Sequence, residues 1–374
     1  MHRATALLLL GGCSIVFDPG SLGTRDAGDR PDAGARDSGT GRDFDARVDL
    51  DGQVDFDAGE RELDPIRGGS SFEGEAIELP FVSDASDRAA FAKTFYSFTV
   101  SEPTQIQLSS ERDGDCVDSI YDFGPRQGGM FYTIASLFAR ECASATINFA
   151  PGEYAVGVGT TDVAADVAFR ISATPISPPE TCRGNALVFN DTSARMLDAC
   201  REFVGTIYLG PALDGFYAGP NVRTVEGSVV GDNGYSLDVP VMPLVEVTQD
   251  IEFNVSTRGL VDLPQLARVG GQFRVPLNAV EAIHVPNLTS LGRLTIWGID
   301  GLSVLELPSL TTAGSLDIRE NPDLVEIDFP RLERVDGAFG IHSNPMLPEC
   351  DVEALQRRVA IGGEVQVLLN APCE

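Results

Sequence analysis

The sequence predicts an all-β protein in which a β-sandwich is followed by a solenoid of stacked parallel strands. Two observations predict it. Short runs of alternating apolar and polar residues, separated by turn residues, fill residues 66–176. From residue 220 onward, apolar positions recur every 22 residues, a period that indicates a solenoid rather than a closed domain.

Composition excludes several classes of protein. The chain has 374 residues, with 27 Lys and Arg against 56 Asp and Glu, for a formal net charge of −29. Phosphate backbones attract basic surfaces, so we expect no nucleic-acid partner. Lys93 is the only lysine, so the sequence holds no GxxxxGK[ST] phosphate loop, and it also lacks GxSxG and HExxH. We expect no cofactor, no metal centre and no enzymatic activity.

Residues 1–13 indicate where the protein is located. A short basic start precedes the apolar run Ala4–Leu10 and the sequence Leu10-Gly11-Gly12-Cys13. This arrangement resembles the signal peptide and lipobox of bacterial lipoproteins. The resemblance implies cleavage before Cys13, lipidation of Cys13, and stable attachment to a membrane through several acyl chains. We therefore expect a cell-envelope protein at the outer membrane or cell surface; the alternative is a chance apolar start with a free cysteine.

Residues 14–65 read as a linker. They repeat Asp, Ala, Gly and Arg with few large apolar side chains, and such a segment cannot bury enough surface to offset its ordering entropy. Asp49-Leu50-Asp51-Gly52 is similar to part of a calcium loop, but Arg47 and Ala58 stand where the first ligand and the closing glutamate belong. We expect a disordered acidic spacer.

Residues 66–176 carry the predicted strands of the sandwich, and Pro151-Gly152-Glu153 supplies a turn between two of them. The expected strands are Thr94–Val100, Ile106–Ser109, Tyr154–Val158 and Val167–Ile171. Their order resembles the pre-peptidase C-terminal domain, a β-sandwich appended to exported bacterial proteins that sometimes binds calcium. The residues that could supply such a site are Asp113, Asp115, Asp118 and Asp122. We interpret them as a polar loop, with calcium as the alternative.

The 22-residue repeat extends over some 130 residues. One apolar phase is Val222, Leu244, Leu266, Leu288, Leu310 and Leu332, and a second is Val225, Val247, Val269, Leu291, Ala313 and Val335. Two apolar-x-apolar pairs follow in the later coils, such as Leu316-Asp317-Ile318 and Ile327-Asp328-Phe329. Stacked coils of this kind pair corresponding strands in parallel and bury a shared interior. Asn321 and Asn344 fall at turns, where an amide can satisfy backbone groups.

Cys182, followed by the segment from Leu197 to Leu209, resembles the start of receptor L domains. These are leucine-rich, right-handed β-helix modules of insulin- and growth-factor-type receptor ectodomains, with similar modules in bacterial surface proteins. The resemblance implies a right-handed β-helix over residues 177–374. A short helix over residues 352–359 is expected near its end, and the coil near residues 231–234 departs from the pattern as a projecting loop.

Cysteine usage agrees with export. Removing Cys13 leaves six cysteines and fifteen formal pairings. The domain boundaries favour three neighbouring pairs, which are Cys116–Cys142, Cys182–Cys200 and Cys350–Cys373. In the chain-entropy model, each disulfide would stabilise the folded state by about 3 kcal/mol because it restricts the unfolded chain.

The repeat aligns polar residues into outward columns. Asp262, His284, Glu306 and Asp328 form one column at a spacing of about 5 Å. One histidine beside three carboxylates could hold a cation or move a proton; we interpret the column as solvated charge. A second column mixes charge signs and reads as a solvated sheet face: Glu252, Arg274, Thr295, Asp317 and Gly340.

Two further side chains stand out. Trp297 could stack on a sugar or a partner, although packing is the commoner role of a lone tryptophan, and His342 follows a strand at a turn, where it suits capping. The sequence thus favours a non-catalytic recognition or adhesion module for an unknown protein or polysaccharide. Its possible ligand-binding face consists of Asp262, His284, Glu306, Asp328 and Trp297. The alternatives are a carbohydrate-active β-helix enzyme that uses the column and a structural envelope protein.

Overall fold

A computed structural model provides the structure of the chain. It describes residues 70–71, 74–83, 94–112, 115–127, 130–131, 133–139, 144–160, 167–210, 221–231, 237–238, 242–253, 257–276 and 279–373. These residues belong to one compact unit, Glu62–Glu374. The predicted lipobox with Cys13, the linker, Asp113, the Cys116–Cys142 bridge and the projecting loop lie outside the described residues.

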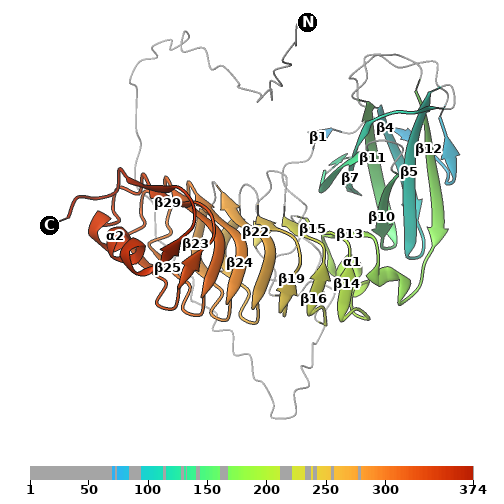
Figure 1. The fold of residues 1–374 in the computed structure, drawn as a ribbon. Helices are drawn as coiled ribbons and strands as arrows, with labels where there is room; N and C mark the ends of the chain where they lie inside the picture. The colour runs from blue at the N-terminus through green and yellow to red at the C-terminus, as the bar shows by residue number, and fades with distance from the viewer. Residues whose placement is uncertain are drawn as a thin grey trace, which may run out of the picture. The chain divides into compact units, whose positions relative to one another are not determined.

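The N-terminal part of this unit is a β-sandwich (Figure 1). One sheet has the order β1-β8-β7-β11-β4-β2, with β9 also paired to β7. Its strands are β1 (Ser70–Ser71), β2 (Glu75–Ala76), β4 (Thr94–Val100), β7 (Ser119–Gln127), β8 (Met130–Phe131), β9 (Ala135–Ala139) and β11 (Gly152–Thr160). The opposing layer pairs β3 (Phe81–Val82), β12 (Ala168–Pro175), β5 (Thr104–Arg112), β6 (Asp115–Cys116) and β10 (Ala145–Phe149) in antiparallel fashion.

Aromatic side chains join the two layers of the sandwich. Phe98 of β4 meets Phe149 of β10 edge to face, with ring centroids 5.6 Å apart, and Tyr154 of β11 meets the same ring at 4.5 Å. All three side chains are buried. Edge-to-face pairs of this kind add stability beyond the area they bury.

The C-terminal part is a solenoid with three series of parallel strands. Two series share a single sheet, here called the long sheet. The first series is β14 (Glu202–Val204), β16 (Thr224–Glu226), β19 (Glu246–Val247), the starts of β22 (Arg268–Pro276), β24 (Ser290–Trp297) and β26 (Thr312–Arg319), then β28 (Arg334–Val335) and β30 (Ala360–Ile361). The second is β13 (Asn185–Val188), β15 (Ile207–Leu209), β17 (Val229–Gly231), β20 (Ile251–Phe253), the ends of β22, β24 and β26, then β29 (Phe339–His342) and β31 (Val365–Leu368).

A third series forms what we call the short face. It comprises β18 (Leu237–Asp238), β21 (Thr257–Asp262) and β23 (Ala279–His284) in one sheet, and β25 (Val304–Glu306) and β27 (Glu326–Asp328) in another. The pairing offset is the predicted repeat, because residues 22 apart are partners, as in Val229 with Ile251 and Leu305 with Ile327. The predicted all-β class, with a sandwich and a solenoid of about 22-residue coils, is confirmed.

The repeated apolar positions form the solenoid core. Leucines of the first phase, such as Leu266 and Leu288, are fully buried, as are Val225 and Val247 of the second phase. Each coil places one residue per phase on the next, so the columns bury each other continuously along the stack. No coil has to stabilise its apolar side chains alone.

Successive coils approach closely at two corners, one formed by asparagines and the other by glycines. At one, the side chain of Asn321 donates to Ile296 O and to the Oδ1 of Asn344, at 3.2 and 3.0 Å, and Asn344 donates to Ile318 O at 3.1 Å. Both asparagines are fully buried, which confirms that these amides satisfy turn backbone groups. At the other corner, a methyl group on Gly314 would overlap the carbonyl oxygen of Gly292, so the backbones approach too closely for any side chain.

The first coil joins the sandwich. Strand β13 pairs in parallel with β10, placing Ile147 opposite Asn185. Successive residues of β13 contribute to different cores, because Ala186 and Val188 lie in the solenoid core whereas Leu187 packs in the sandwich core. The N-terminal end of the solenoid is therefore covered by β10.

A helix replaces the third strand in both terminal coils. Helix α1 (Asp191–Arg195) follows β13 and begins with a capping box between Asn190 and Ser193. Helix α2 (Glu349–Arg358) follows β29 and starts three residues earlier than predicted, because Pro348 stands at its N-cap and acidic residues fill its first turn. The predicted Cys182–Cys200 and Cys350–Cys373 disulfides are both present, one in each terminal coil.

Candidate functional site

The predicted column begins with a close contact on the short face. Asp262 ends β21 and His284 ends β23, and strand pairing places them side by side. The Nδ1 of His284 lies 2.7 Å from the Oδ1 of Asp262. The histidine side chain is 55% exposed and that of Asp262 is 26% exposed, so both groups remain accessible to solvent.

The column continues as a second pair. Glu306 ends β25 and is paired with Asp328 at the end of β27, and both residues are exposed. Within the described residues, no ladder pairing joins β23 to β25, so the column consists of two pairs in two sheets. The structure therefore brings Asp262 to His284 and Glu306 to Asp328.

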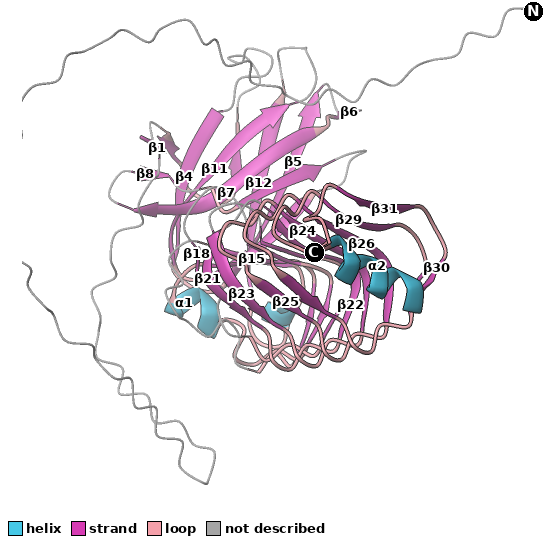
Figure 2. Ribbon diagram, turned by 90° about the vertical axis from the view of Figure 1, so that its left-hand side faces the viewer, coloured by secondary structure: helices cyan, strands magenta, loops and turns pink. Residues whose placement is uncertain are grey.

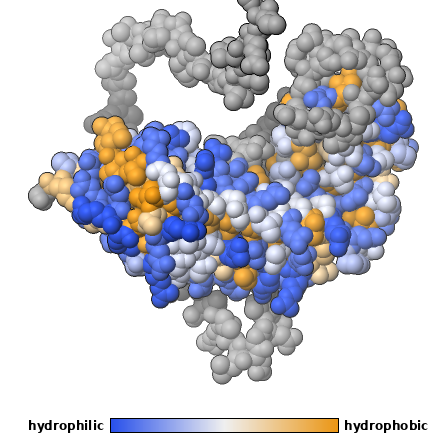
Figure 3. Space-filling view, in the orientation of Figure 1, coloured by the Kyte–Doolittle hydropathy of each residue, from blue (hydrophilic) through white to orange (hydrophobic). Residues whose placement is uncertain are grey.

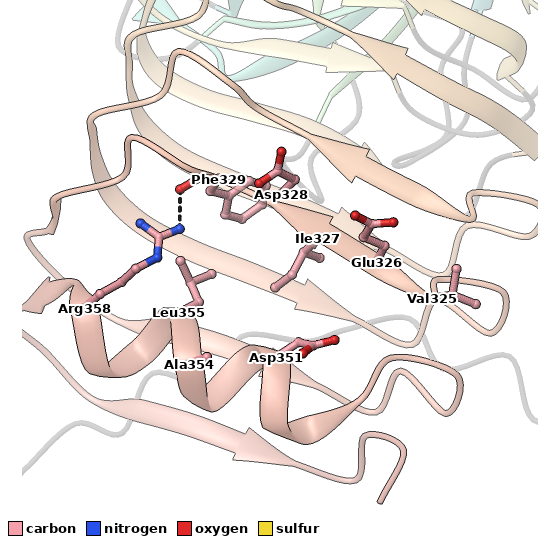
Figure 4. A pocket seen from close by; sticks show the side chains of 9 residues that line it. All are labelled: Val325, Glu326, Ile327, Asp328, Phe329, Asp351, Ala354, Leu355 and Arg358. Atoms are coloured by element: carbon pink, nitrogen blue, oxygen red, sulfur yellow. Dashed lines mark hydrogen bonds between the residues drawn. The ribbon is translucent and has the colours of Figure 1, made fainter. Parts of the chain in front are cut away.

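A groove lies at the end of the column, between β27 and α2 (Figure 4). Its volume is about 460 Å³. Ile327 of β27 points toward Leu355 of α2, while the carboxylates of Glu326 and Asp328 point to the opposite side of the strand. Asp351 lies near the start of the helix. Leu355 is buried, whereas Val325 is 41% exposed and Ile327 is half-buried, so accessible apolar surface lies beside these carboxylates. Such a lining suits a cationic group carried on an aliphatic chain.

Arg358 lines this groove, and its main role is to attach helix α2 to the solenoid through hydrogen bonds. Its guanidinium donates to the backbone oxygens of Phe329 at 2.5 Å, Leu332 at 3.2 Å and Pro330 at 3.4 Å. These carbonyls follow the last strand of the short face, where no further coil supplies donors. These hydrogen bonds attach the end of the helix to the segment that follows β27.

Charge compensation differs between the two faces of the solenoid. On the long sheet, carboxylates lie near arginines: Glu246 at 3.8 Å from Arg268, Glu252 at 3.9 Å from Arg274, and Asp317 at 3.4 Å from Arg319. Along the groove, Glu326, Asp328 and Asp351 have no ion-pair partner within the described part of the chain. Apart from Arg358, whose guanidinium is bonded to backbone carbonyls, the groove thus presents three carboxylates without an ion-pair partner.

The second predicted column is in register as expected, from Glu252 to Gly340. Its description as a solvated face is wrong at Gly340, which is buried, and at Thr295, which is only 6% exposed. The reason is that Gln272 of the preceding coil covers it and donates to its hydroxyl at 2.8 Å.

Trp297 is already engaged within the protein. The guanidinium carbon of Arg319 lies 4.8 Å from the centroid of its ring, and its indole N–H donates to the Oε2 of Glu320 at 3.1 Å. The cation over the ring occupies one face that a sugar would use for stacking. His342 ends β29, and its Nδ1 lies 3.2 Å from the Oγ of Ser343, in keeping with a role at the turn.

Two of the four aspartates considered for calcium, Asp118 and Asp122, have described side chains. Asp122 of β7 accepts a hydrogen bond from Ser136 at 2.8 Å and is buried, whereas Asp118 lies in the connection before that strand. No group of three or more His, Cys, Asp or Glu side chains suited to a metal ion occurs among the residues that the structure describes.

Sequence reasoning identified Asp328 but missed Glu326, Asp351 and Leu355, which complete the groove. The sequence feature that could have revealed these residues is the end of the repeat. In the coil after Asp328, a predicted helix stands where the third series would have its next strand. A helix next to the last strand leaves a groove along their junction.

No protein-family model matches the sequence, and no curated protein matches it. Among solved structures, the chain is similar to a crystal structure of the pre-peptidase C-terminal domain of a collagenase from Bacillus anthracis. The match has 19% sequence identity, covers 29% of this chain and all of that chain, and has a TM-score of 0.23. Within the described ranges, the helices are all too short or too polar to cross a bilayer.

Proposed function

We propose that this chain is a lipid-anchored protein of a bacterial cell envelope whose solenoid recognises a protein partner with basic side chains. The observation that carries the recognition role is the uncompensated negative charge along the groove between β27 and α2. Opposite charge on a partner would raise the association rate and favour the correct orientation.

The shape of the groove supports a basic side chain as the recognised group. The methylenes of an arginine or a lysine would contact Val325, which is 41% exposed, and the half-buried Ile327, and the charged end would reach Asp328, Glu326 or Asp351. The stacked coils hold these carboxylates on strands and a helix rather than on loops, so little conformational entropy is lost when a partner binds.

The proposed anchor rests on the sequence around Cys13. Lipidation at that residue would attach the chain to the outer membrane, and the acidic linker of residues 14–65 would separate the solenoid from the lipid surface. The oxidising compartment in which such proteins reside is one where disulfides such as Cys182–Cys200 persist.

The experiment is affinity capture from bacterial envelope extracts with the immobilised protein, followed by measurement of the captured partner's affinity. The test variant neutralises the groove as Glu326→Gln, Asp328→Asn and Asp351→Asn. The matched control neutralises the same number of carboxylates on the long sheet as Glu246→Gln, Glu252→Gln and Asp317→Asn. We expect the groove variant to weaken binding about tenfold or more, and the control to change it less than about threefold.

Each alternative function has its own outcome. A partner bound equally by the groove variant and by the original chain would contradict the assigned surface. Turnover of a polysaccharide that is lost with Asp328→Ala would favour the carbohydrate-active enzyme. Absence of any saturable partner in protein and glycan fractions would favour a structural envelope role.

A further inference from the structure

The last coil of the solenoid differs from the others because its outer edge is open. Strand β31 pairs with β29, placing Val365 beside Phe339, and within the described residues no strand pairs with its other side. Figure 2 looks onto this end, where α2, β30 and β31 form the final coil. Helix α2 covers the end of the short face but leaves the edge of β31 exposed.

The backbone register shows which groups face outward. Phe339 N donates to Glu364 O and Ser343 N donates to Leu368 O, so even-numbered residues of this segment bond to β29. Successive residues of a strand direct their N–H and C=O groups to opposite sides. The N–H and C=O groups of Val365 and Val367 therefore lie along the open edge.

The side chains at this end are apolar and exposed. Val365 points to the same side as the buried Phe339, yet it is 39% exposed because no further coil covers it. Leu368 is 45% and Leu369 is 70% exposed, and Met346, in the turn after β29, is 55% exposed. Figure 3 shows a hydrophobic area at this end of the solenoid. Edge strands are usually protected by charge, proline or a covering element, and β31 contains neither charge nor proline.

Charge identifies a second copy of this chain as the occupant. The chain has a net charge of −29, so most of its surface repels another copy. Residues 359–373 contain a single charged residue, Glu364. The opposite end of the solenoid is covered by β10, so among the described residues the edge of β31 is the end of the stack at which a second copy can add by strand pairing. Such a contact closes as a two-fold dimer.

We propose that the chain forms a symmetric dimer by antiparallel pairing of β31 with β31 of a second copy. The register follows from the outward groups. Val365 pairs with Val367 of the partner subunit, and the reverse pair gives four backbone hydrogen bonds in total. Gln366 then lies opposite its own symmetry mate, and Glu364 lies opposite a leucine, so no like charges face each other. The apolar interiors of the two solenoids become continuous.

The test is sedimentation velocity of the full chain over about 1 to 100 µM, where a weak dimer dissociates on dilution. The variant Gln366→Glu places two carboxylates opposite each other and should weaken the dimer about tenfold. Gln366 is exposed, so the fold is retained, as equal unfolding midpoints would verify. The matched control Gln265→Glu makes the same change at an exposed site far from the edge and should leave association unchanged.

Disulfide cross-linking tests the proposed β31–β31 register directly. Directly opposed residues of an antiparallel pair lie within disulfide distance, so Gln366→Cys should give a reducible covalent dimer under mild oxidation, and Gln265→Cys should not. The proposal is overturned by a monomer at all concentrations, by larger open assemblies, or by a dimer that Gln366→Glu leaves intact and Gln366→Cys does not cross-link.

Discussion

Asn321 and Asn344 occupy the same corner of successive coils, and the side chain of Asn344 accepts from both the backbone N–H and the side-chain amide of Asn321, at 3.1 and 3.0 Å. Asn370 extends this ladder, since its Oδ1 accepts from the backbone N–H of Asn344 at 3.2 Å. Each amide thus satisfies backbone groups of its neighbour in a corner from which water is excluded.

Replacing Asn344 with alanine should therefore destabilise the solenoid. The substitution leaves the buried backbone N–H of Asn321 without a partner and removes one of the hydrogen bonds to the carbonyl of Ile318, at a combined cost of about 2 to 3 kcal/mol. Urea unfolding measures this loss. The control Asn287→Ala removes a hydrogen bond to Pro264 O at an exposed position and should cost less than about 1 kcal/mol. Equal losses for both variants would refute the role of the ladder.

The close backbone approach at the glycine corner predicts that two Gly→Ala substitutions differ in their effect on stability. A methyl group at Gly314 overlaps the backbone oxygen of Gly292, whereas a methyl group at Gly340 would lie 3.5 Å from its nearest neighbour, Leu316 O. We expect Gly314→Ala to lower the free energy of unfolding by about 2 kcal/mol or more, and Gly340→Ala to be tolerated. Thermal unfolding of the two variants tests this, and a Gly314→Ala protein as stable as the original would show that the corner can relax.

The two disulfides should differ in their rate of reduction. Cys182 and Cys200 are 8% and 1% exposed, whereas Cys373 is exposed and Cys350 is half-buried. A thiolate must reach a sulfur atom, so a reductant should open Cys350–Cys373 first. Brief reduction followed by alkylation and mass spectrometry measures the order. Earlier labelling of Cys182 and Cys200 would contradict the burial of the first coil.

Glu226 gives the solenoid a pH dependence. Its hydrogen bond with Glu202 of the preceding coil, together with the charge of that residue, raises the pKa of Glu226 above its ordinary value of 4.5. The protonated form is favoured in the folded state, so this pair stabilises the fold most below pH 4.5 and loses its contribution as the pH rises through the raised pKa. Glu226→Gln keeps a neutral donor at every pH, so the variant should exceed the original chain in melting temperature at pH 7 but not at pH 4. Parallel melting profiles for the two proteins would rule out the shared proton.

Much of the fold follows from the sequence because the repeat imposes it. Leu266 and Leu288 are 22 residues apart, and that spacing alone places them on adjacent coils. Asn321 and Asn344 were predictable for the same reason. The glycine column shares the period, at Gly292 and Gly314, but glycines in predicted turns are expected anyway, so the sequence does not reveal the close backbone approach.

The groove was only partly predictable. The position of Asp328 followed from the strand pattern, but Asp351 and Leu355 reach the groove from a helix whose direction no repeat determines. Thr295 shows the other limit, since its burial depends on a glutamine in the neighbouring coil. Side chains that cover one another across coils are set by packing, not by the spacing of apolar residues.

The central claim is that the uncompensated carboxylates at the end of the short face bind basic side chains. The most direct measurement is selection of peptides from a random display library on the intact protein, with binding of the enriched peptides to the variant Glu326→Gln, Asp328→Asn, Asp351→Asn then compared. We predict enriched peptides that carry arginine or lysine beside apolar residues, and a loss of about tenfold in affinity for the groove variant. Enriched peptides without basic residues, or with equal affinity for both proteins, would contradict the account.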